Sequence, residues 1–363
     1  AYTDIDITNY HNKVLSTDWA QALELNKELA LHPRLEQKHI DKERDVILEE
    51  MKRYEDEPAN KVGEVFHGML YPKTSLGMRV IGEIDSMKAA DAKTLRAYHE
   101  QWYAPERMVV ILAGRITNHE SRITEKTEDW FGSLHNSKFI IHDSNEKNKS
   151  KAHGTTDFDR VSDIQDAPRL EVATKPDAAQ AHLTIGLRTF ARGSEDRFGW
   201  SLLNLIMGVG FTSRLFKEVR EKRGLCYAIR SGADSWADVG YWSIYAGVAT
   251  EKVEEATRAI LGELGKAAEK GVTQEEINIA KKRIKTVLAF KAEDPEFFTE
   301  WYGRQELFGQ PILTVEDYIN KLEKVTKEHI NKLTEKYFKT STLNMALVWN
   351  KKRDEAINKL LHL

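Results

Sequence analysis

The chain has 363 residues, 41% of them hydrophobic, so it is long enough for two domains that each bury a core. Its 54 basic and 57 acidic residues give a net charge of −3, which argues against a nucleic-acid partner. The sequence has no run of about 18 apolar residues, so it predicts no membrane span. The single cysteine, Cys226, excludes an intrachain disulfide and fits a reducing compartment, so we expect a cytoplasmic location and leave a periplasmic or organellar one open.

Predicted helices dominate residues 1–135. Near the start, Tyr2 to Thr8 alternates β-branched and polar residues, which predicts a strand. An uninterrupted apolar run at 108–113 predicts a buried strand. The spacing of apolar residues between and after these strands predicts helices at 18–31, 37–54, 59–70, 89–101 and 118–131.

A polar stretch at 136–168, rich in Lys, Asn, Ser and Asp, predicts a linker between a first domain, 1–135, and a second domain, 169–363. Beyond this linker, strands are predicted at 169–173, 181–187, 226–231, 241–248 and 343–349. The predicted helices of the second domain are 198–207, 213–222, 252–270, 274–290, 295–307 and 315–337, with a short helix at the end.

The two halves repeat each other at an offset of roughly 235 residues. The predicted helix 18–31 corresponds to 252–270, and the long helix that ends before Glu57-Pro58 corresponds to the one that ends before Asp294-Pro295. Carried back, the offset aligns Ala1 with about Ser235, so residues 169–234 have no counterpart in the first domain. We therefore expect a truncated first domain, with part of its sheet uncovered.

One acidic stretch is a candidate metal site. Glu43 and Glu50 are seven residues apart, so they lie on one face of the predicted helix, together with Val46 and Ile47. A carboxylate on such a face can bind a metal while the other carboxylate supports it. A solvated acidic helix edge is the alternative.

A second candidate is the basic helix that ends at Gly224, followed by a strand that carries Tyr227. The spacing allows Arg220 and Tyr227 to face one cleft. The alternative is an exposed helix followed by an ordinary strand tyrosine. Cys226, beside Tyr227, is most simply a small core residue.

Both stretches resemble peptidase family M16, the pitrilysin/insulinase-type zinc peptidases. Glu-Arg-Asp-Val-Ile-Leu-Glu-Glu-Met at 43–51, followed by Asp56-Glu57-Pro58, is similar to the helix that supplies the third zinc ligand in that family. Ser-Arg-Leu-Phe and Val-Arg-Glu-Lys-Arg-Gly-Leu-Cys-Tyr, within 213–227, resemble its second-domain signature. The resemblance extends from Ala1 to about Trp349, with shorter matches at Ala1-Tyr2-Thr3, Leu76 to Gly82, and Gln180-Ala181-His182.

The resemblance implies an α+β fold of two homologous domains, each a mostly antiparallel sheet covered by helices. This is the LuxS/mitochondrial-processing-peptidase-like metallohydrolase fold, which closes as a clam shell around a chamber. It also implies a zinc-dependent metalloendopeptidase whose substrates are peptides or unfolded polypeptides. A homodimer or a pairing with another M16 subunit fits the same resemblance.

Site residues follow from the same resemblance. Glu50 becomes a zinc ligand and Glu43 a carboxylate that supports it, whereas Val287 takes the place of Glu50 in the second domain, which therefore holds no metal. Arg220 and Tyr227 become contacts to the substrate backbone. The predicted edge strand, with Tyr2, Thr3 and Asp4, takes the substrate as an added strand.

The chain departs from the family in one respect. None of its 12 histidines stands in a His-x-x-Glu-His motif, which supplies two zinc ligands and the general base. Counted back from Glu50, that motif falls upstream of Ala1. We therefore expect no catalytic base and no tightly held zinc in this chain alone. The alternative is a non-catalytic M16-like subunit that acts as a binding or assembly partner.

Overall fold

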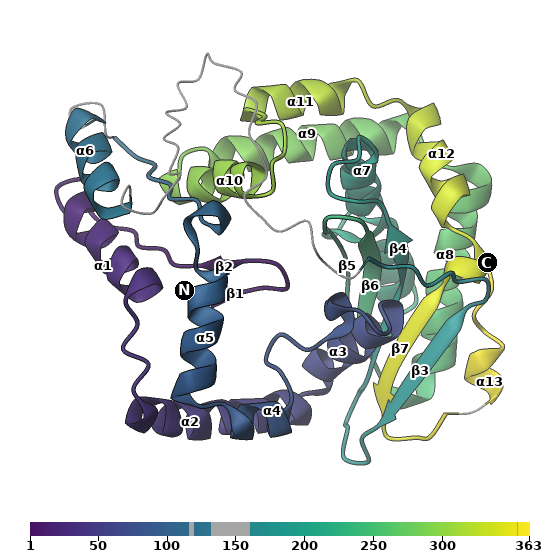
Figure 1. The fold of residues 1–363 in the computed structure, drawn as a ribbon. Helices are drawn as coiled ribbons and strands as arrows, with labels where there is room; N and C mark the ends of the chain where they lie inside the picture. Colours follow the sequence, from purple (N-terminus) through teal and green to yellow (C-terminus); the bar gives the residue numbers. More distant parts are fainter. Residues whose placement is uncertain (116–119, 132–159, 354) are drawn as a thin grey trace. The chain divides into compact units, whose positions relative to one another are not determined.

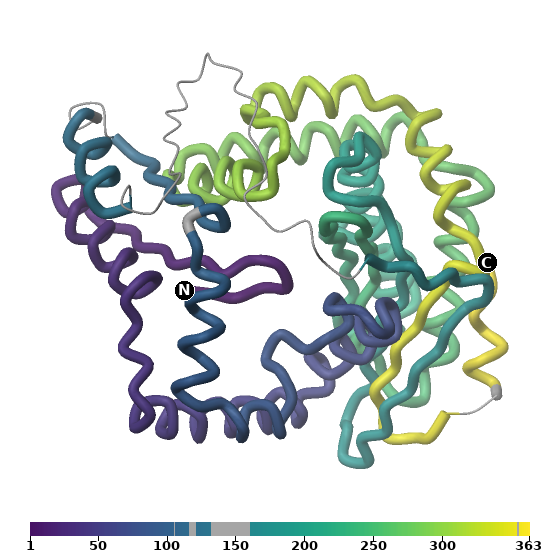
Figure 2. The backbone as a smooth tube through the Cα atoms, in the orientation of Figure 1, coloured from purple at the N-terminus to yellow at the C-terminus, as the bar shows by residue number. Residues whose placement is uncertain are grey.

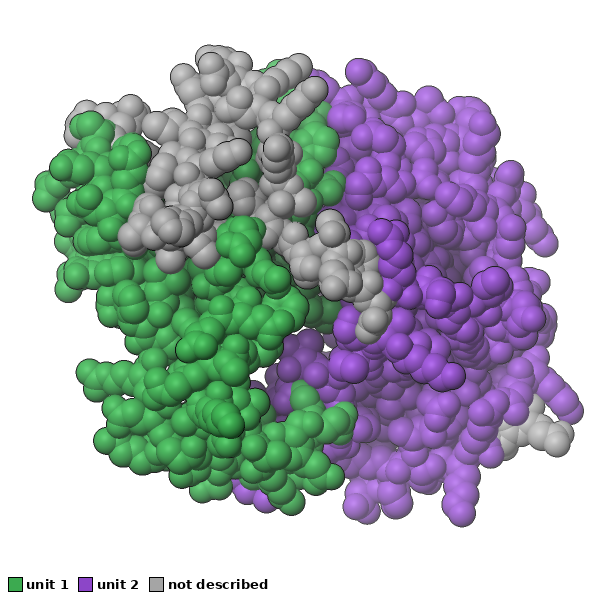
Figure 3. All heavy atoms as spheres, viewed as in Figure 1, with its two compact units in different colours: residues 1–48, 82–158, 285–319 green, residues 49–81, 159–284, 320–363 purple. Residues whose placement is uncertain are grey.

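The computed structural model describes residues 1–115, 120–131, 160–353 and 355–363, which divide into two compact units (Figure 3). Unit 1 comprises residues 1–48, 82–158 and 285–319, and unit 2 comprises 49–81, 159–284 and 320–363. Each unit therefore contains segments from both halves of the sequence. The predicted domains 1–135 and 169–363 stay a prediction, because they are defined by the sequence repeat, whereas the compact units are defined by packing.

Unit 2 is built on a five-stranded sheet in the order β3-β7-β4-β6-β5. Its strands β4 (Ala181–Thr189), β5 (Cys226–Ser235), β6 (Gly240–Val248) and β7 (Asn344–Trp349) pair antiparallel. Strand β3 (Arg169–Thr174) pairs parallel with β7, so the sheet is mixed. The α+β class is therefore confirmed, with one parallel pair in a sheet that is otherwise antiparallel.

Helices cover both faces of this sheet (Figure 1). The helices α7 (Asp196–Gly208), α8 (Val253–Lys270) and α12 (Lys327–Tyr337) lie on one face, where Trp242 of β6 stacks on Phe338. On the other face lies α3 (Pro58–Leu70), which comes from the first half of the chain. Its Phe66 fits against the sheet because residue 186 is glycine: a Cβ there would lie 2.8 Å from Phe66 Cζ.

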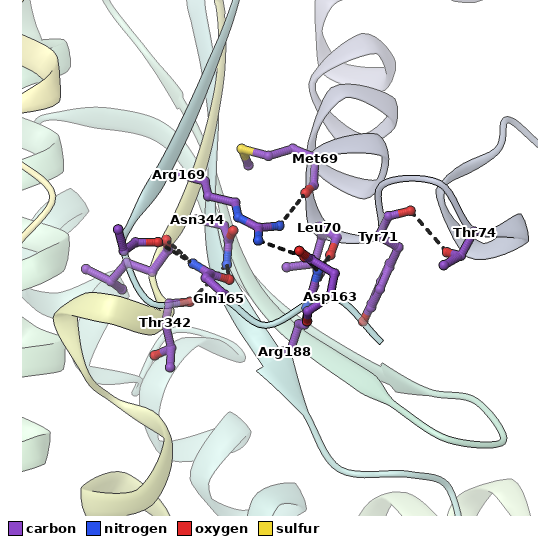
Figure 4. Close-up of polar contacts among 12 residues, drawn as sticks. Met69, Leu70, Tyr71, Thr74, Asp163, Gln165, Arg169, Arg188, Thr342 and Asn344 are labelled. Carbon is purple, nitrogen blue, oxygen red and sulfur yellow. Dashed lines mark hydrogen bonds and ion pairs between the residues drawn. The ribbon is translucent and has the colours of Figure 1, made fainter. Parts of the chain in front are cut away.

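The C-terminal end of α3 is fixed to the sheet by two arginines (Figure 4). Arg188 Nε donates to the carbonyl oxygen of Leu70 at 2.7 Å, and Arg169 Nη1 donates to that of Met69 at 3.4 Å. Asp163 Oδ2 accepts a hydrogen bond of 2.7 Å from each arginine. These cations satisfy carbonyl groups at the negative end of the helix dipole. They thereby anchor the segment that follows Glu50.

Unit 1 combines a small sheet with helices from both halves of the chain. Its elements are β1 (Tyr2–Thr3), β2 (Thr8–Asn9), α1 (Trp19–Leu31), α4 (Ile84–Ala89), α5 (Ala92–Trp102), α6 (Glu120–Phe131), α10 (Pro295–Leu307) and residues 37–48 of α2 (Gln37–Asp56). α1 and α6 enclose a core of Trp19, Leu23, Ile123 and Phe131. The helices α9 (Gln274–Lys291) and α11 (Val315–Glu323), like α2, belong in part to each unit, and α13 (Glu355–Asn358) belongs to unit 2.

Two strand predictions in the first half are wrong. Residues 2–8 do not form one strand but turn back as a hairpin (Figure 2), because Asp4 N donates to the carbonyl oxygen of Ile7 at 2.8 Å and Thr3 pairs with Thr8. Residues 108–113 are not a strand, because no described segment forms a ladder with them. Apolar composition alone does not make a strand without a neighbouring strand to pair with.

Two helix predictions need correction as well. The helix predicted at 89–101 begins at Ala92, because Asp91 accepts a hydrogen bond from the backbone of Thr94 and caps a separate helix, α5. The helix predicted at 315–337 is two helices, α11 and α12, since Thr326 caps the second in the same way. Most of the predicted linker, residues 136–159, lies outside the described residues, and 160–168 have no helix or strand.

Candidate functional site

The side chains of Arg220 and Tyr227 lie near each other on unit 2. Arg220 belongs to η3 (Phe216–Lys222), a π-helical segment, and Tyr227 is the second residue of β5. The guanidinium carbon of Arg220 lies 5.8 Å from the ring centroid of Tyr227 and 4.9 Å from that of Phe216. Both distances allow cation–π attraction between the guanidinium and each ring.

Irregular backbone carries both side chains: a π-helical segment carries Arg220 and a β-bulge carries Tyr227. In the pairing of β5 with β6, Cys226 opposes Val248 and Ala228 opposes Gly247, which leaves Tyr227 as the extra residue of a β-bulge. Bulges re-aim a side chain, and Tyr227 is 76% exposed. Between helix and bulge, Gly224 adopts a φ of +58° and Leu225 N donates to the carbonyl oxygen of Val219 at 3.0 Å. This glycine cap ends η3 and turns the chain into the strand.

A bidentate ion pair anchors the start of this segment. Arg214 Nε and Nη2 donate to the two carboxylate oxygens of Glu276, at 2.6 and 2.8 Å, and Nη2 also donates to the carbonyl oxygen of Gly271 at 3.0 Å. Burial would raise the pKa of the Glu276 carboxyl, but hydrogen bonds from Arg214 and Thr273 outweigh it, so the pKa lies below its ordinary value. The sequence did not predict this pair, although Arg214 stands in the Ser-Arg-Leu-Phe motif.

Cys226, next to Tyr227, is buried. Burial raises the pKa of its thiol to about 11, and the charge of Arg220 offsets only part of this effect. The thiol is therefore protonated at neutral pH and packs as a small core residue instead of acting as a nucleophile.

Glu50 and Glu43 are both on α2, but the division between the units falls between Leu48 and Glu49. The Glu50 side chain is 42% exposed, and its Oε1 lies 3.9 Å from Nη2 of Arg53. Glu43 is exposed. In the described part of the chain, no group of three or more His, Cys, Asp or Glu side chains could hold a metal ion. A peptidase zinc site needs three protein ligands, so the described residues alone do not fit zinc.

The residues expected to bind a substrate strand belong to unit 1. Tyr2 and Thr3 form β1, whereas Asp4 lies in the turn that follows, where its Oδ1 accepts from Ile5 N at 2.8 Å. The hydroxyl of Tyr2 donates to Glu300 of α10. Glu300 is not among the residues predicted from the sequence, because nothing local marks a contact across 298 positions.

No described helix is both long enough and apolar enough to cross a lipid bilayer.

Two family profiles match the chain. Residues 89–284 match the profile described as "Peptidase M16 inactive domain", and residues 1–83 match "Insulinase (Peptidase family M16)". A protein named as an uncharacterized zinc protease in Mycobacterium tuberculosis (strain H37Rv) is 32% identical over 331 residues, which cover 91% of this chain and 72% of that protein. Another uncharacterized zinc protease, from Bacillus subtilis (strain 168), is 28% identical over 348 residues, 96% of this chain and 80% of that protein.

Solved structures share the fold. A structure described as a protease from Helicobacter pylori superposes with a TM-score of 0.82 at 20% identity, over 92% of this chain and 78% of that one. A structure described as the peptidase M16 inactive domain from Pseudomonas fluorescens gives a TM-score of 0.78 at 19% identity, over 94% and 77%. At these identities the likeness is one of fold.

Proposed function

The chain belongs to peptidase family M16, and on that premise we propose that the complete protein is a zinc-dependent metalloendopeptidase that cleaves peptides or unfolded polypeptides. The observation that carries the proposal is the contact of Arg220 with Tyr227, on backbone irregularities that expose the tyrosine. In the repeat, these residues belong to the predicted second domain, which binds substrate without holding metal.

Arg220 and Tyr227 bind the backbone of an extended substrate. A guanidinium has only donors and a phenol can donate as well, so both groups suit the carbonyl oxygens of a peptide. The neighbouring carboxylate of Glu218 is engaged elsewhere, with Lys222 at 3.1 Å and Arg223 at 3.0 Å. The positive charge of Arg220 is therefore left to interact with the rings of Phe216 and Tyr227 and with a bound peptide.

In this proposal Glu50 is one zinc ligand of the complete protein, and Glu43 supports it. A zinc ion held by three protein ligands would lower the pKa of a bound water and polarise the scissile carbonyl. Since the described residues supply no such ligand set, no step of catalysis is assigned to them. Their part is to contribute one carboxylate and to bind the substrate.

The edge of β1 away from β2 supports strand addition as the binding mode. Within the described residues β1 pairs only with β2, in a two-stranded sheet, so a peptide can pair with its other side. Tyr2 and Thr3 supply this edge, and Asp4 ends it. Backbone pairing tolerates many sequences, which fits unfolded substrates.

The single cysteine supports a reducing compartment, so we propose that the protein is cytoplasmic. We propose further that it forms a homodimer or pairs with another M16 subunit.

The alternative, a non-catalytic M16-like subunit, shares the binding residues but lacks the chemistry. Binding of a labelled unfolded peptide, compared between Arg220→Ala and the matched variant Arg258→Ala, whose guanidinium pairs with Glu254 on the surface, tests the substrate role. Weaker binding for Arg220→Ala alone supports the proposal, and equal affinity for both contradicts it. Chelator-sensitive hydrolysis by the full-length gene product separates the peptidase from the alternative.

A further inference from the structure

The carboxylate of Glu300, on α10, joins the two strands of the hairpin in unit 1. Its Oε1 accepts hydrogen bonds from the Tyr2 hydroxyl at 2.9 Å and from Asn9 Nδ2 at 2.6 Å, and its Oε2 lies 3.0 Å from the same hydroxyl. Tyr2 and Asn9 are directly opposite each other in the β1–β2 pairing. One side chain from the second half of the sequence therefore holds a cross-strand pair in the first half.

The hairpin depends on such support. Each of its strands has only two residues, and isolated two-stranded hairpins are marginally stable in water. Two further polar contacts lie nearby: Asp294, which caps α10, accepts from Lys13, beyond the hairpin, at 2.7 Å, and Arg304 of α10 lies 4.0 Å from Asp6 in the turn. Glu300 differs from these two residues because it contacts both strands.

We propose that Glu300 is a positioning residue that fixes the register in which a peptide strand pairs with β1. The inference rests on the proposed function, in which β1 is the edge that receives the substrate. Residues of a strand alternate between its two faces and a slip of one residue exchanges them, so an added strand needs an edge that does not move. Glu300 supplies this by holding Tyr2 and Asn9 in one arrangement.

The test uses the 363-residue chain and a set of labelled peptides, each N-methylated at one amide. In the wild type, methylation at alternate positions should weaken binding about tenfold relative to the positions between them, because only the former amides face β1. Glu300→Ala should reduce this ratio to about onefold, since the edge no longer imposes one register. Glu300→Gln keeps an acceptor oxygen and should retain most of the ratio. Tyr2→Phe, which leaves α10 intact, should lower the ratio as well.

Glu296→Ala is the matched control, because Glu296 stands on the same helix and its carboxylate lies 3.6 Å from the exposed Lys13, away from both strands of the hairpin. It should keep the wild-type ratio. A purely structural effect of Glu300→Ala would lower the fraction of binding-competent protein and weaken the binding of all peptides by the same factor, so the ratio would not change. An unchanged ratio in both Glu300→Ala and Tyr2→Phe therefore overturns the positioning role of Glu300, while β1 remains the proposed binding edge. No alternation in the wild type means that peptide does not add to β1, and then the proposed edge and this inference both fall.

Discussion

The guanidinium carbon of Arg220 lies 5.8 Å from the ring centroid of Tyr227, and the chain reaches this contact through a π-helical segment and a β-bulge. π-Helical turns and bulges are often found at functional sites. The segment is also anchored at its start, by the pairing of Arg214 with Glu276. The backbone on both sides of the contact therefore determines where the two side chains lie.

Removing either member of the pair should weaken peptide binding and leave the fold intact. We expect Arg220→Ala to raise the Kd for an unfolded peptide about tenfold, because one hydrogen bond from a charged group contributes about 1.5 kcal/mol. Tyr227→Phe should have a smaller effect in the same direction. Fluorescence anisotropy gives the Kd and calorimetry the Tm. A Tm several degrees lower with an unchanged Kd would make the pair structural.

The Arg214–Glu276 pair should contribute to stability. Both side chains are mostly buried, with exposed fractions of 18% and 26%, so Arg214→Ala leaves a carboxylate short of its main partner. We expect a loss of about 2 kcal/mol in the free energy of unfolding, measured in urea. Arg258→Ala is the control, since its pair with Glu254 is on the surface, and it should cost less than about 0.5 kcal/mol. Equal losses for both variants would contradict this account.

Much of the fold could be predicted because its signals are local. Asp294-Pro295 marks the start of α10, where Asp294 accepts from Glu296 N and Pro295 occupies the first turn. The apolar periodicity of α1 and α8 likewise depends on neighbouring residues alone. These elements begin and end within one or two residues of their predicted bounds.

The remainder depends on distant partners. Whether 108–113 becomes a strand is decided by a neighbouring strand, and the hairpin at 2–9 is decided by a turn that alternation does not reveal. The hydrogen bond between Tyr2 and Glu300 joins residues 298 positions apart. Of the candidate site, sequence reasoning could name Arg220 and Tyr227, but the bulge that exposes Tyr227 appears only in the β5–β6 register.

The hydrogen bonds that Asp163 accepts from Arg188 and Arg169 at the C-terminal end of α3 should make the stability of the fold depend on pH. Hydrogen bonds from Arg188 and Arg169 hold the pKa of Asp163 below its ordinary value. The carboxylate therefore stabilises the folded state fully above the unfolded pKa of about 3.9, and this contribution is lost as the pH falls through the lower folded value. Urea denaturation should show Asp163→Asn less stable than the wild type at pH 7, with the difference shrinking below about pH 4. The control is Asp177→Asn, at an exposed carboxylate, which should show no such dependence. If the loss of stability in Asp163→Asn is the same at every pH, the charge of Asp163 is not its cause.

Zinc content after dialysis tests the central claim, that this chain is part of a zinc peptidase in which Glu50 is a ligand. The full-length gene product should retain about one zinc per chain, because a peptidase site needs three protein ligands, and the 363-residue chain should retain less than about a tenth of that. Glu50→Gln in the full-length protein should abolish both the zinc and peptide hydrolysis, whereas Glu49→Gln, whose exposed carboxylate pairs with Lys52, should change neither. One tightly held zinc in the 363-residue chain, or an unchanged zinc content in Glu50→Gln, would contradict the account.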